Sequence, residues 1–151
     1  MGDRSEPGQT RQDYSKRFAI VLSRGLEPWM ALNAAAHIAA YLGNKLIDTF
    51  DTGDSFTTRD GAHYPRNSQF PIIVLSATRE MMHEVGERAR HSGLLYHCFI
   101  REMIETSDDD AIARVMADKA HADVECLGVG VFGPTKQVST VTKSLSLWKN
   151  F

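Results

Sequence analysis

Four short apolar segments, separated by stretches with helical periodicity, constrain the fold of this chain more than any other feature of its sequence. Each segment has the length of a single strand, and most of its side chains are aliphatic or aromatic. The segment PIIVLSA at 71–77 is apolar almost throughout, which is typical of a strand covered on both faces of its sheet. The predicted strands lie at 17–23, 71–77, 93–100 and 124–133. Their alternation with helices predicts an α/β domain with a mostly parallel or mixed sheet.

The helical segments between these strands are recognised from their ends. Pro28 suits the first position of a helix, and Gly43 suits the left-handed position that follows a last turn. Thr78 can cap a second helix, which has an amphipathic pattern. The predicted helices span 28–43, 78–92, 107–123 and 134–147.

Two segments fall outside this alternation. Residues 1–15 are polar and without periodicity, so we expect a flexible tail followed by a single domain over residues 16–151. Residues 44–70 form a polar, turn-rich insertion. Within it, Asp60 and Gly61 favour a two-residue turn, which predicts a β-hairpin.

Composition and charge exclude several classes of protein. The 151 residues have the usual size of one domain and can form a core without disulfides or metals. A formal net charge of −2 argues against a general nucleic-acid binder. No apolar run approaches the roughly 20 residues that span a bilayer, and no signal-peptide pattern is visible. We therefore expect a cytoplasmic protein without membrane contact.

The cysteines and histidines follow no pattern typical of a metal site. Cys98 and Cys126 both fall in predicted strands, and we interpret them as core residues rather than as a disulfide or a catalytic thiol. The six histidines show neither the HExxH pattern nor zinc-type spacing with cysteines. We expect no metal and no other cofactor.

The stretch GVGVFGPTK contains the first candidate binding site. Gly133 permits a close backbone approach, and Pro134 begins a helix whose free N–H groups could hold an anion beside Thr135 and Lys136. The stretch is neither a Walker loop nor a Rossmann fingerprint. An equally supported alternative is that the glycines only allow close packing between the strand and a helix.

The helix at 28–43 contains the second candidate site. It places Met30, Asn33, His37 and Tyr41 on one side at spacings of three and four, while half of its other residues are alanine. Its N-terminus follows the carboxyl end of the first strand, where α/β sheets usually bind ligands. The alternative for His37 is a half-exposed, hydrogen-bonded residue without a chemical role.

Three segments of the chain resemble a known fold family. KRFAIVLSRGLEPWMALNAAAHIAAYLG, SATREMMHEVGERARHSGLLYHCFIREM and ECLGVGVFGPTKQVSTVTKSLSL together resemble type 2 peptidyl-tRNA hydrolases. More closely, they resemble a bacterial family of that fold, the domain of unknown function numbered two thousand. The resemblance covers about residues 16–149. It implies a three-layer α/β/α domain with a mixed four-stranded sheet, and a homodimer.

The resemblance does not imply a complete hydrolase site. With His37 aligned to the motif histidine of the hydrolases, Met30 takes the place of their lysine and Ala34 that of their glutamine. Arg101, Glu102 and Met103 stand where the hydrolases have Asp-Ala-Gly. His37 and Glu102 therefore remain as the candidates for acid–base roles.

We derive three functional hypotheses from the sequence. The favoured one is a protein that binds a small or anionic ligand, or a partner, in a cleft between the N-terminus of the first helix and the Gly133–Pro134 turn. The second is a peptidyl-tRNA hydrolase-like esterase, with Lys136, Lys143 and Lys149 contacting the phosphates of tRNA. The third is a purely structural or interaction homodimer. The residues expected at the cleft are Arg24, Asn33, His37, Glu102, Gly133, Thr135 and Lys136.

Overall fold

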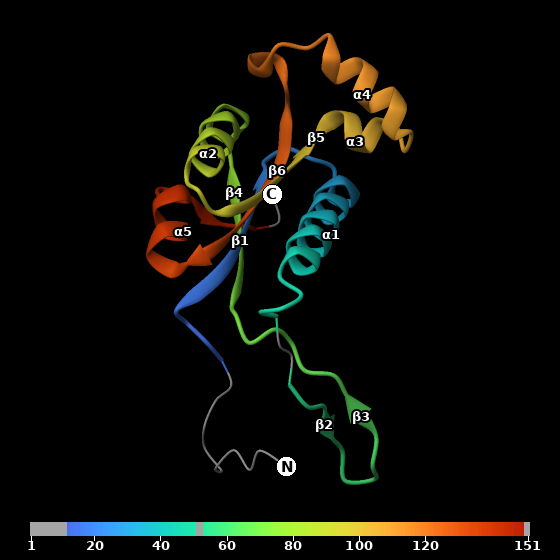
Figure 1. Ribbon diagram of the computed structural model, residues 1–151, viewed down its shortest axis with the longest axis vertical. Coiled ribbons are helices and arrows are strands. Elements are labelled where there is room, and N and C mark those ends of the chain that lie inside the picture. Colours follow the sequence, from blue (N-terminus) through green and yellow to red (C-terminus); the bar gives the residue numbers. More distant parts are fainter. Residues whose placement is uncertain (1–11, 51–52, 150–151) are drawn as a thin grey trace.

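The fold is built around a mixed five-stranded sheet (Figure 1). The computed structural model describes residues 12–50 and 53–149, so most of the predicted tail lies outside the described residues. The strand order is β5-β6-β1-β4-β7, in which β1 and β4 are parallel and the other neighbours are antiparallel. The strands are β1 (Lys16–Ser23), β4 (Ile72–Ala77), β5 (Leu95–Ile100), β6 (Cys126–Pro134) and β7 (Ser146–Leu147).

Helices cover both faces of this sheet, and the domain therefore has three layers. The helix α1 packs on one face, whereas α2 and α5 pack on the other. The helices are α1 (Pro28–Lys45), α2 (Arg79–His91), α3 (Arg101–Glu105), α4 (Asp109–Ala117), α5 (Thr135–Val141) and the short 3-10 helix η1 (His121–Asp123). Among the described residues, none of the helices is long and apolar enough to cross a membrane.

The central strand β1 separates two hydrophobic clusters. Phe18, Ile20 and Leu22 belong to the cluster beneath α1, whereas Ala19 and Val21 belong to the cluster beneath α2 and α5. This division follows from the two-residue period of a strand, whose successive side chains point to opposite faces. Burial on both faces explains why this segment is a continuous apolar run in the sequence.

The glycines of β6 allow α1 to approach the sheet closely. A Cβ atom at Gly130 would lie 2.1 Å from Cγ2 of Ile38, and one at Gly128 would lie 2.8 Å from Cδ1 of the same side chain. Ala31 and Ala34 are also buried against the sheet. The other face of α1 is exposed and includes further alanines, so only part of its alanine content serves close packing.

The expected four-stranded sheet is wrong, because a fifth strand follows the last helix. The predicted helix over 134–147 ends at Val141, and Ser144 has a positive φ of 67°. The chain then turns back so that Ser146 and Leu147 pair with β4. A strand of two residues is too short to produce a recognisable pattern in the sequence, which is why the pattern predicted a continuous helix.

Two other segments differ in detail from the prediction. The helix expected over 107–123 is interrupted: α4 ends at Ala117, and η1 follows as a separate turn. The predicted hairpin is confirmed as β2 (Phe56–Thr57) paired with β3 (His63–Tyr64). Its connection is longer than the expected two-residue turn. The backbone carbonyl of Thr58 accepts from the N–H of Gly61, and the N–H of Thr58 donates to the carbonyl of Ala62, which closes a loop.

We predict that Gly130→Ala destabilises the fold by about 3 kcal/mol, since an added methyl group must displace the buried Ile38. The matched control is Gly43→Ala in α1, where a Cβ atom meets nothing within 4 Å. This control should be neutral or stabilising by up to about 1 kcal/mol. Urea denaturation of both variants measures the difference. Equal stability of Gly130→Ala and the original protein would contradict the close approach of α1.

Candidate functional site

The register of the sheet separates residues that the sequence analysis placed in one cleft. Arg24 and the N-terminus of α1 follow the carboxyl end of β1, whereas Gly133 pairs with Arg17 near the start of the same strand. Seven residues of extended chain span roughly 20 Å. A single small cleft therefore does not include both the N-terminus of α1 and the Gly133–Pro134 turn.

The residues around the Gly133–Pro134 turn have structural partners within the chain. A Cβ atom at Gly133 would lie 2.7 Å from Cδ2 of Leu94, so this glycine permits close packing. The backbone N–H of Thr135 donates to the carbonyl of Ser15 at 3.0 Å, and its hydroxyl donates to the carbonyl of Tyr14 at 2.7 Å. These contacts favour the packing interpretation over an anion site. Lys136 is exposed on α5.

The candidates near the N-terminus of α1 are exposed. Asn33 lies on the solvent side of the helix, as does His37 one turn later. Arg24 follows β1, and its Nε donates to the hydroxyl of Ser76 at 3.3 Å. The backbone N–H of Arg24 also donates to the carbonyl of Ala77 at 2.8 Å, which ties the chain after β1 to the end of β4.

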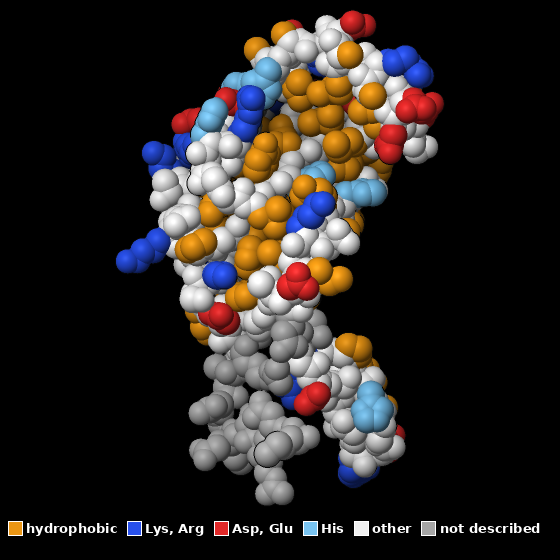
Figure 2. Space-filling view, in the orientation of Figure 1, with side chains coloured by type: hydrophobic (Ala, Val, Ile, Leu, Met, Phe, Trp, Pro, Cys, Tyr) orange, Lys and Arg blue, Asp and Glu red, His pale blue; other side chains and the backbone are white. Residues whose placement is uncertain are grey.

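His37 instead lines a cleft between α1, β5 and the α3–α4 segment. The cleft has a volume of about 510 Å³, and the His37 ring stacks on Phe99 with 5.6 Å between ring centroids. Tyr41 lies against His97 with 4.6 Å between their centroids. Burial, together with the nearby His37, lowers the pKa of His97. Figure 2 shows apolar side chains gathered beside α3 and α4, with histidines at the border of this area.

Glu102, the other candidate acid–base residue, forms a buried ion pair. Its side chain is 8% exposed, and one carboxylate oxygen accepts from Nζ of Lys119. This hydrogen bond lowers the pKa of the Glu102 carboxyl. Glu102 is not among the residues that line the cleft beside His37, so the structure does not bring the two together as an acid–base pair. The ion pair fastens α3 to the segment that follows α4.

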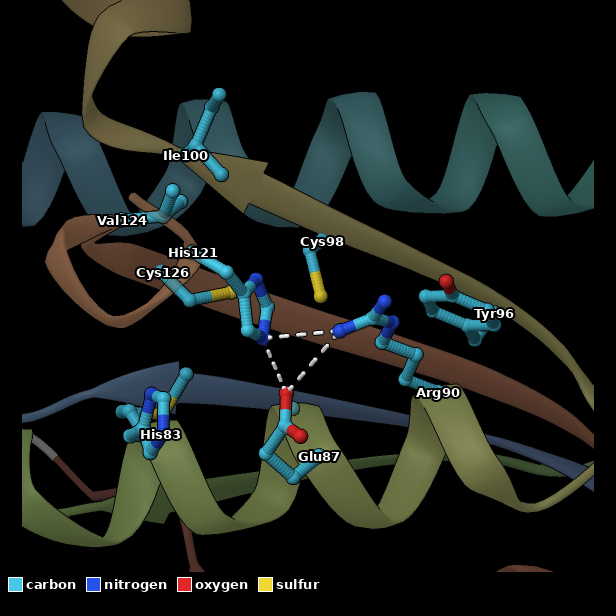
Figure 3. A pocket seen from close by; sticks show the side chains of 11 residues that line it. His83, Glu87, Arg90, Tyr96, Cys98, Ile100, His121, Val124 and Cys126 are labelled. Atoms are coloured by element: carbon cyan, nitrogen blue, oxygen red, sulfur yellow. Dashed lines mark hydrogen bonds and ion pairs between the residues drawn. The ribbon is translucent and has the colours of Figure 1, made fainter. Parts of the chain in front are cut away.

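A different set of polar residues meets in a pocket between α2, β5, β6 and η1 (Figure 3). This pocket, which we call the thiol pocket, has a volume of about 250 Å³. Its inner wall is mainly apolar, and its polar groups gather where α2 faces η1. The residues that line it are Met82, His83, Gly86, Glu87, Arg90, Tyr96, Cys98, Ile100, His121, Val124 and Cys126.

Glu87 organises the polar side of the thiol pocket. Its Oε1 lies 2.5 Å from Nε2 of His121, and its Oε2 lies 3.4 Å from Nε2 of His91. Arg90, one turn further along α2, has its NH1 atom 3.9 Å from Oε1 of the same carboxylate. The hydrogen bond from His121 is the main reason why the pKa of Glu87 is lowered. Glu87 is therefore a carboxylate at neutral pH.

These distances decide how the protons of the cluster are arranged. Because ionised Glu87 can only accept, its 2.5 Å contact requires a proton on Nε2 of His121. Nε2 then cannot accept from Arg90, although NH1 of Arg90 lies 3.1 Å away. Among the described residues, no carboxylate lies closer to Arg90 than Glu87 at 3.9 Å. The guanidinium thus has donors available to a bound group.

Both cysteines line the apolar side of the same pocket. They are half-buried free thiols that border the cluster beneath α2. The expected core role therefore holds only for the side of each residue that faces this cluster. Cys126 donates to the carbonyl of Gly128 with a separation of 3.1 Å. The neighbouring Cys126 thiol lowers the pKa of Cys98, whereas the Cys98 thiol together with burial raises the pKa of Cys126. The pair is therefore chemically asymmetric.

Only half of this site has a signal in the sequence. His83, Glu87 and Arg90 recur at spacings of four and three on the predicted α2, which places them on one helix face. That spacing is a usable signal for half of the site. Nothing in the sequence indicates that His121, in a 3-10 turn more than 30 residues away, returns to this face.

Metal binding finds no support in the described part of the chain. It contains no group of three or more histidine, cysteine, aspartate or glutamate side chains arranged to hold a metal ion. The polar groups that line the thiol pocket are side-chain donors, acceptors and thiols. Together, fold and pocket define a three-layer α/β domain with a small, thiol-lined cavity beneath one helix layer.

Comparisons with known proteins place this domain in a family. The family model described as protein of unknown function (DUF2000) matches residues 16–149, so the chain belongs to that family. A solved structure of a protein of unknown function from Agrobacterium tumefaciens strain C58 has a TM-score of 0.78 and 21% sequence identity. The alignment covers 91% of this chain and 100% of that one, which shows a shared fold. No curated protein matches the chain.

We predict that the Glu102–Lys119 ion pair makes the fold sensitive to acid. Because the pKa of Glu102 is lowered in the folded state, its contribution is present above the unfolded value of about 4.5 and is lost as the pH falls below it. Glu102→Gln should cost about 2 kcal/mol of unfolding free energy at pH 7 and much less at pH 3. Chemical denaturation at both pH values measures this.

The matched control for this prediction is Glu105→Gln, which changes an exposed carboxylate on the same short helix. Its effect should be within about 0.5 kcal/mol at both pH values. If Glu102→Gln and Glu105→Gln behave alike, the ion pair does not stabilise the fold.

Proposed function

We propose that this protein binds a small, partly apolar ligand with a carboxylate or similar anionic group in the thiol pocket. The observation that carries the proposal is a concave, apolar cavity whose polar side holds Arg90 with donors available. Arginine binds carboxylates through two parallel hydrogen bonds, and small-molecule sites commonly pair an apolar wall with a few directional polar groups.

The size of the pocket limits the ligand. Its volume of about 250 Å³ is smaller than most sites for drug-sized molecules, which begin at roughly 300 Å³. A single aromatic ring or a short acyl chain fits such a space. Tyr96 and Ile100 supply apolar surface for this part of the ligand.

The charges of the polar side set the orientation of the ligand. Glu87 repels an anion, but its carboxylate already accepts from His121 and lies near Arg90 and His91. An anionic group is therefore best placed against Arg90, on the side away from Glu87. The apolar part of the ligand then lies against the wall formed by Tyr96 and Cys98.

The proposed function belongs to the class that the sequence favoured, but its binding site lies elsewhere in the domain. The sequence analysis favoured a small or anionic ligand in a cleft that would have included Gly133 and Thr135. The thiol pocket offers the charge and the cavity that this hypothesis requires, on the opposite side of the sheet from α1. The homodimer and the cytoplasmic location stay predictions.

We predict that benzoate and hexanoate bind more tightly than benzamide and hexanamide, which have the same size without the charge. Binding should shift the amide resonances of Tyr96 and Cys98 in titrations followed by NMR spectroscopy. Arg90→Ala should weaken benzoate binding by about tenfold, which corresponds to about 1.4 kcal/mol. Equal affinity for acids and amides would refute an anionic ligand.

The control for Arg90→Ala is Arg114→Ala, which removes an exposed arginine from α4, outside the pocket. Arg114→Ala changes the net charge by the same amount as Arg90→Ala, but at a position outside the pocket. If both variants weaken benzoate binding equally, the attraction comes from the overall charge of the protein and not from the pocket.

The second candidate function is ester hydrolysis of the peptidyl-tRNA hydrolase type in the cleft beside His37. The observation in its favour is that His37 and His97 share one cleft of about 510 Å³. Since Glu102 pairs with Lys119 elsewhere, His97 or Asp109 would have to supply the second acid–base group.

We expect His37→Ala to abolish any cleavage of a model peptidyl-tRNA by the purified protein. The variant Asn33→Ala, which alters an exposed residue one turn earlier on α1, is the matched control and should retain it. Absence of cleavage by the original protein, at low salt where tRNA binds best, eliminates this second candidate.

A further inference from the structure

The two cysteines of the thiol pocket form a pair because of a local irregularity in the sheet. Cys98 lies in β5, and Cys126 is the first residue of β6. The pairing of these strands shifts between Phe99 and Ile100, so that Ile100 lies opposite Cys126 and Leu127 has no partner on β5. This bulge places both side chains on the α2 side of the sheet, where both line the thiol pocket.

Hydrogen bonding gives the two sulfur atoms different roles. Cys126 donates its single S–H group to the carbonyl oxygen of Gly128, with a separation of 3.1 Å. The neighbouring Cys126 thiol lowers the pKa of Cys98. Cys98 is therefore the stronger nucleophile of the pair, and Cys126 remains a protonated thiol beside it.

The sulfur of Cys98 also faces the cavity. It points into the pocket toward the side chains of His121 and Arg90 (Figure 3). A Cβ atom at Gly86 would lie 4.0 Å from this sulfur, so the glycine of α2 leaves space above it. A hydroperoxide is much smaller than the cavity of about 250 Å³.

We propose that Cys98 and Cys126 are a peroxide-reactive dithiol, in which Cys98 is the attacked sulfur and Cys126 resolves the product to a disulfide. The oxidant is a hydroperoxide, either hydrogen peroxide or a small organic one. This proposal depends on the thiol pair alone and not on the anionic ligand proposed above.

The reaction balances in two steps. The Cys98 thiolate attacks the terminal oxygen of the hydroperoxide, an S–O bond forms, the O–O bond breaks, and the departing oxygen takes a proton to become an alcohol or water. Cys126 then attacks the sulfur of the Cys98 sulfenic acid, an S–S bond forms, and the hydroxide that leaves takes the Cys126 proton to become water. Two thiols are oxidised by two electrons in total, and one hydroperoxide is reduced.

The bulge makes the second step geometrically feasible. A disulfide needs its two sulfur atoms about 2.05 Å apart, so the two thiols must move toward each other. Cys126 follows η1 and begins its strand, and Leu127 is unpaired, so the backbone at this point is less constrained than within the sheet. An external thiol would reduce the disulfide by exchange.

The test treats reduced, desalted protein with one equivalent of hydrogen peroxide at pH 7 and follows its intact mass. We expect an intramolecular Cys98–Cys126 disulfide, seen as the loss of two hydrogen atoms and of both iodoacetamide-reactive thiols. Cys126→Ser should stop at a Cys98 sulfenic acid, which dimedone traps. Cys98→Ser should form neither product, and dithiothreitol should restore both thiols of the original protein.

A variant of Glu87 distinguishes activation of Cys98 from simple exposure. The carboxylate of Glu87 opposes the Cys98 thiolate, so Glu87→Gln should shift the pH profile of Cys98 alkylation to lower pH. Circular dichroism shows whether each variant is folded.

The proposal is overturned if Cys98 reacts with peroxide no faster than free cysteine, or if the disulfide joins two molecules. Benzoate binding of the reduced protein is measured separately, so either proposal can fail alone.

Discussion

The close contact between α1 and β6 is the interaction on which the rest of the structure depends. Gly128 and Gly130 present no side chain toward α1, so Ile38 reaches the backbone of β6 and fills the space that larger residues would occupy. The residues that alternate with them, Val129 and Val131, point to the opposite face and form the floor beneath α2 and α5. One strand thus sets a short distance to the helix on one face and an ordinary distance on the other.

The thiol pocket follows from how α2 lies on that second face. Val85 and Ala89 bury one side of the helix in the core. Gly86 adds no side chain between this buried side of α2 and Cys98, so space remains there. Glu87 and Arg90 lie at the border of this space. η1 closes the far side and brings His121 within 2.5 Å of Glu87. The cavity therefore results from a missing side chain on α2 and an irregular turn before β6, and both are local features of the chain.

The sequence predicted the layers of the fold better than it predicted the site, and the reason is physical. The apolar run at 17–23 shows burial directly, because both faces of β1 are covered, whereas Ile72 in the equally apolar run 71–77 is 50% exposed. The two-residue strand at Ser146 and Leu147 left no such signal. Site residues depend on register: the shared pairing with β1 places Gly133 far from Arg24, and the bulge beside Ile100 brings Cys126 to Cys98. Register and bulges are not visible in composition or periodicity.

The same reasoning explains why the motifs that identify the family need not be its functional residues. Gly133 packs against Leu94, and Thr135 uses both of its donors on the segment before β1. These motif positions hold the framework together, so a chain can keep them while its chemistry lies elsewhere. The 21% identity shared with the structure from Agrobacterium tumefaciens is sufficient for this framework, as the TM-score of 0.78 shows. Whether a relative has the same function is better judged by the residues that correspond to Cys98, Cys126, Glu87 and Arg90, because those are the groups on which both proposals depend.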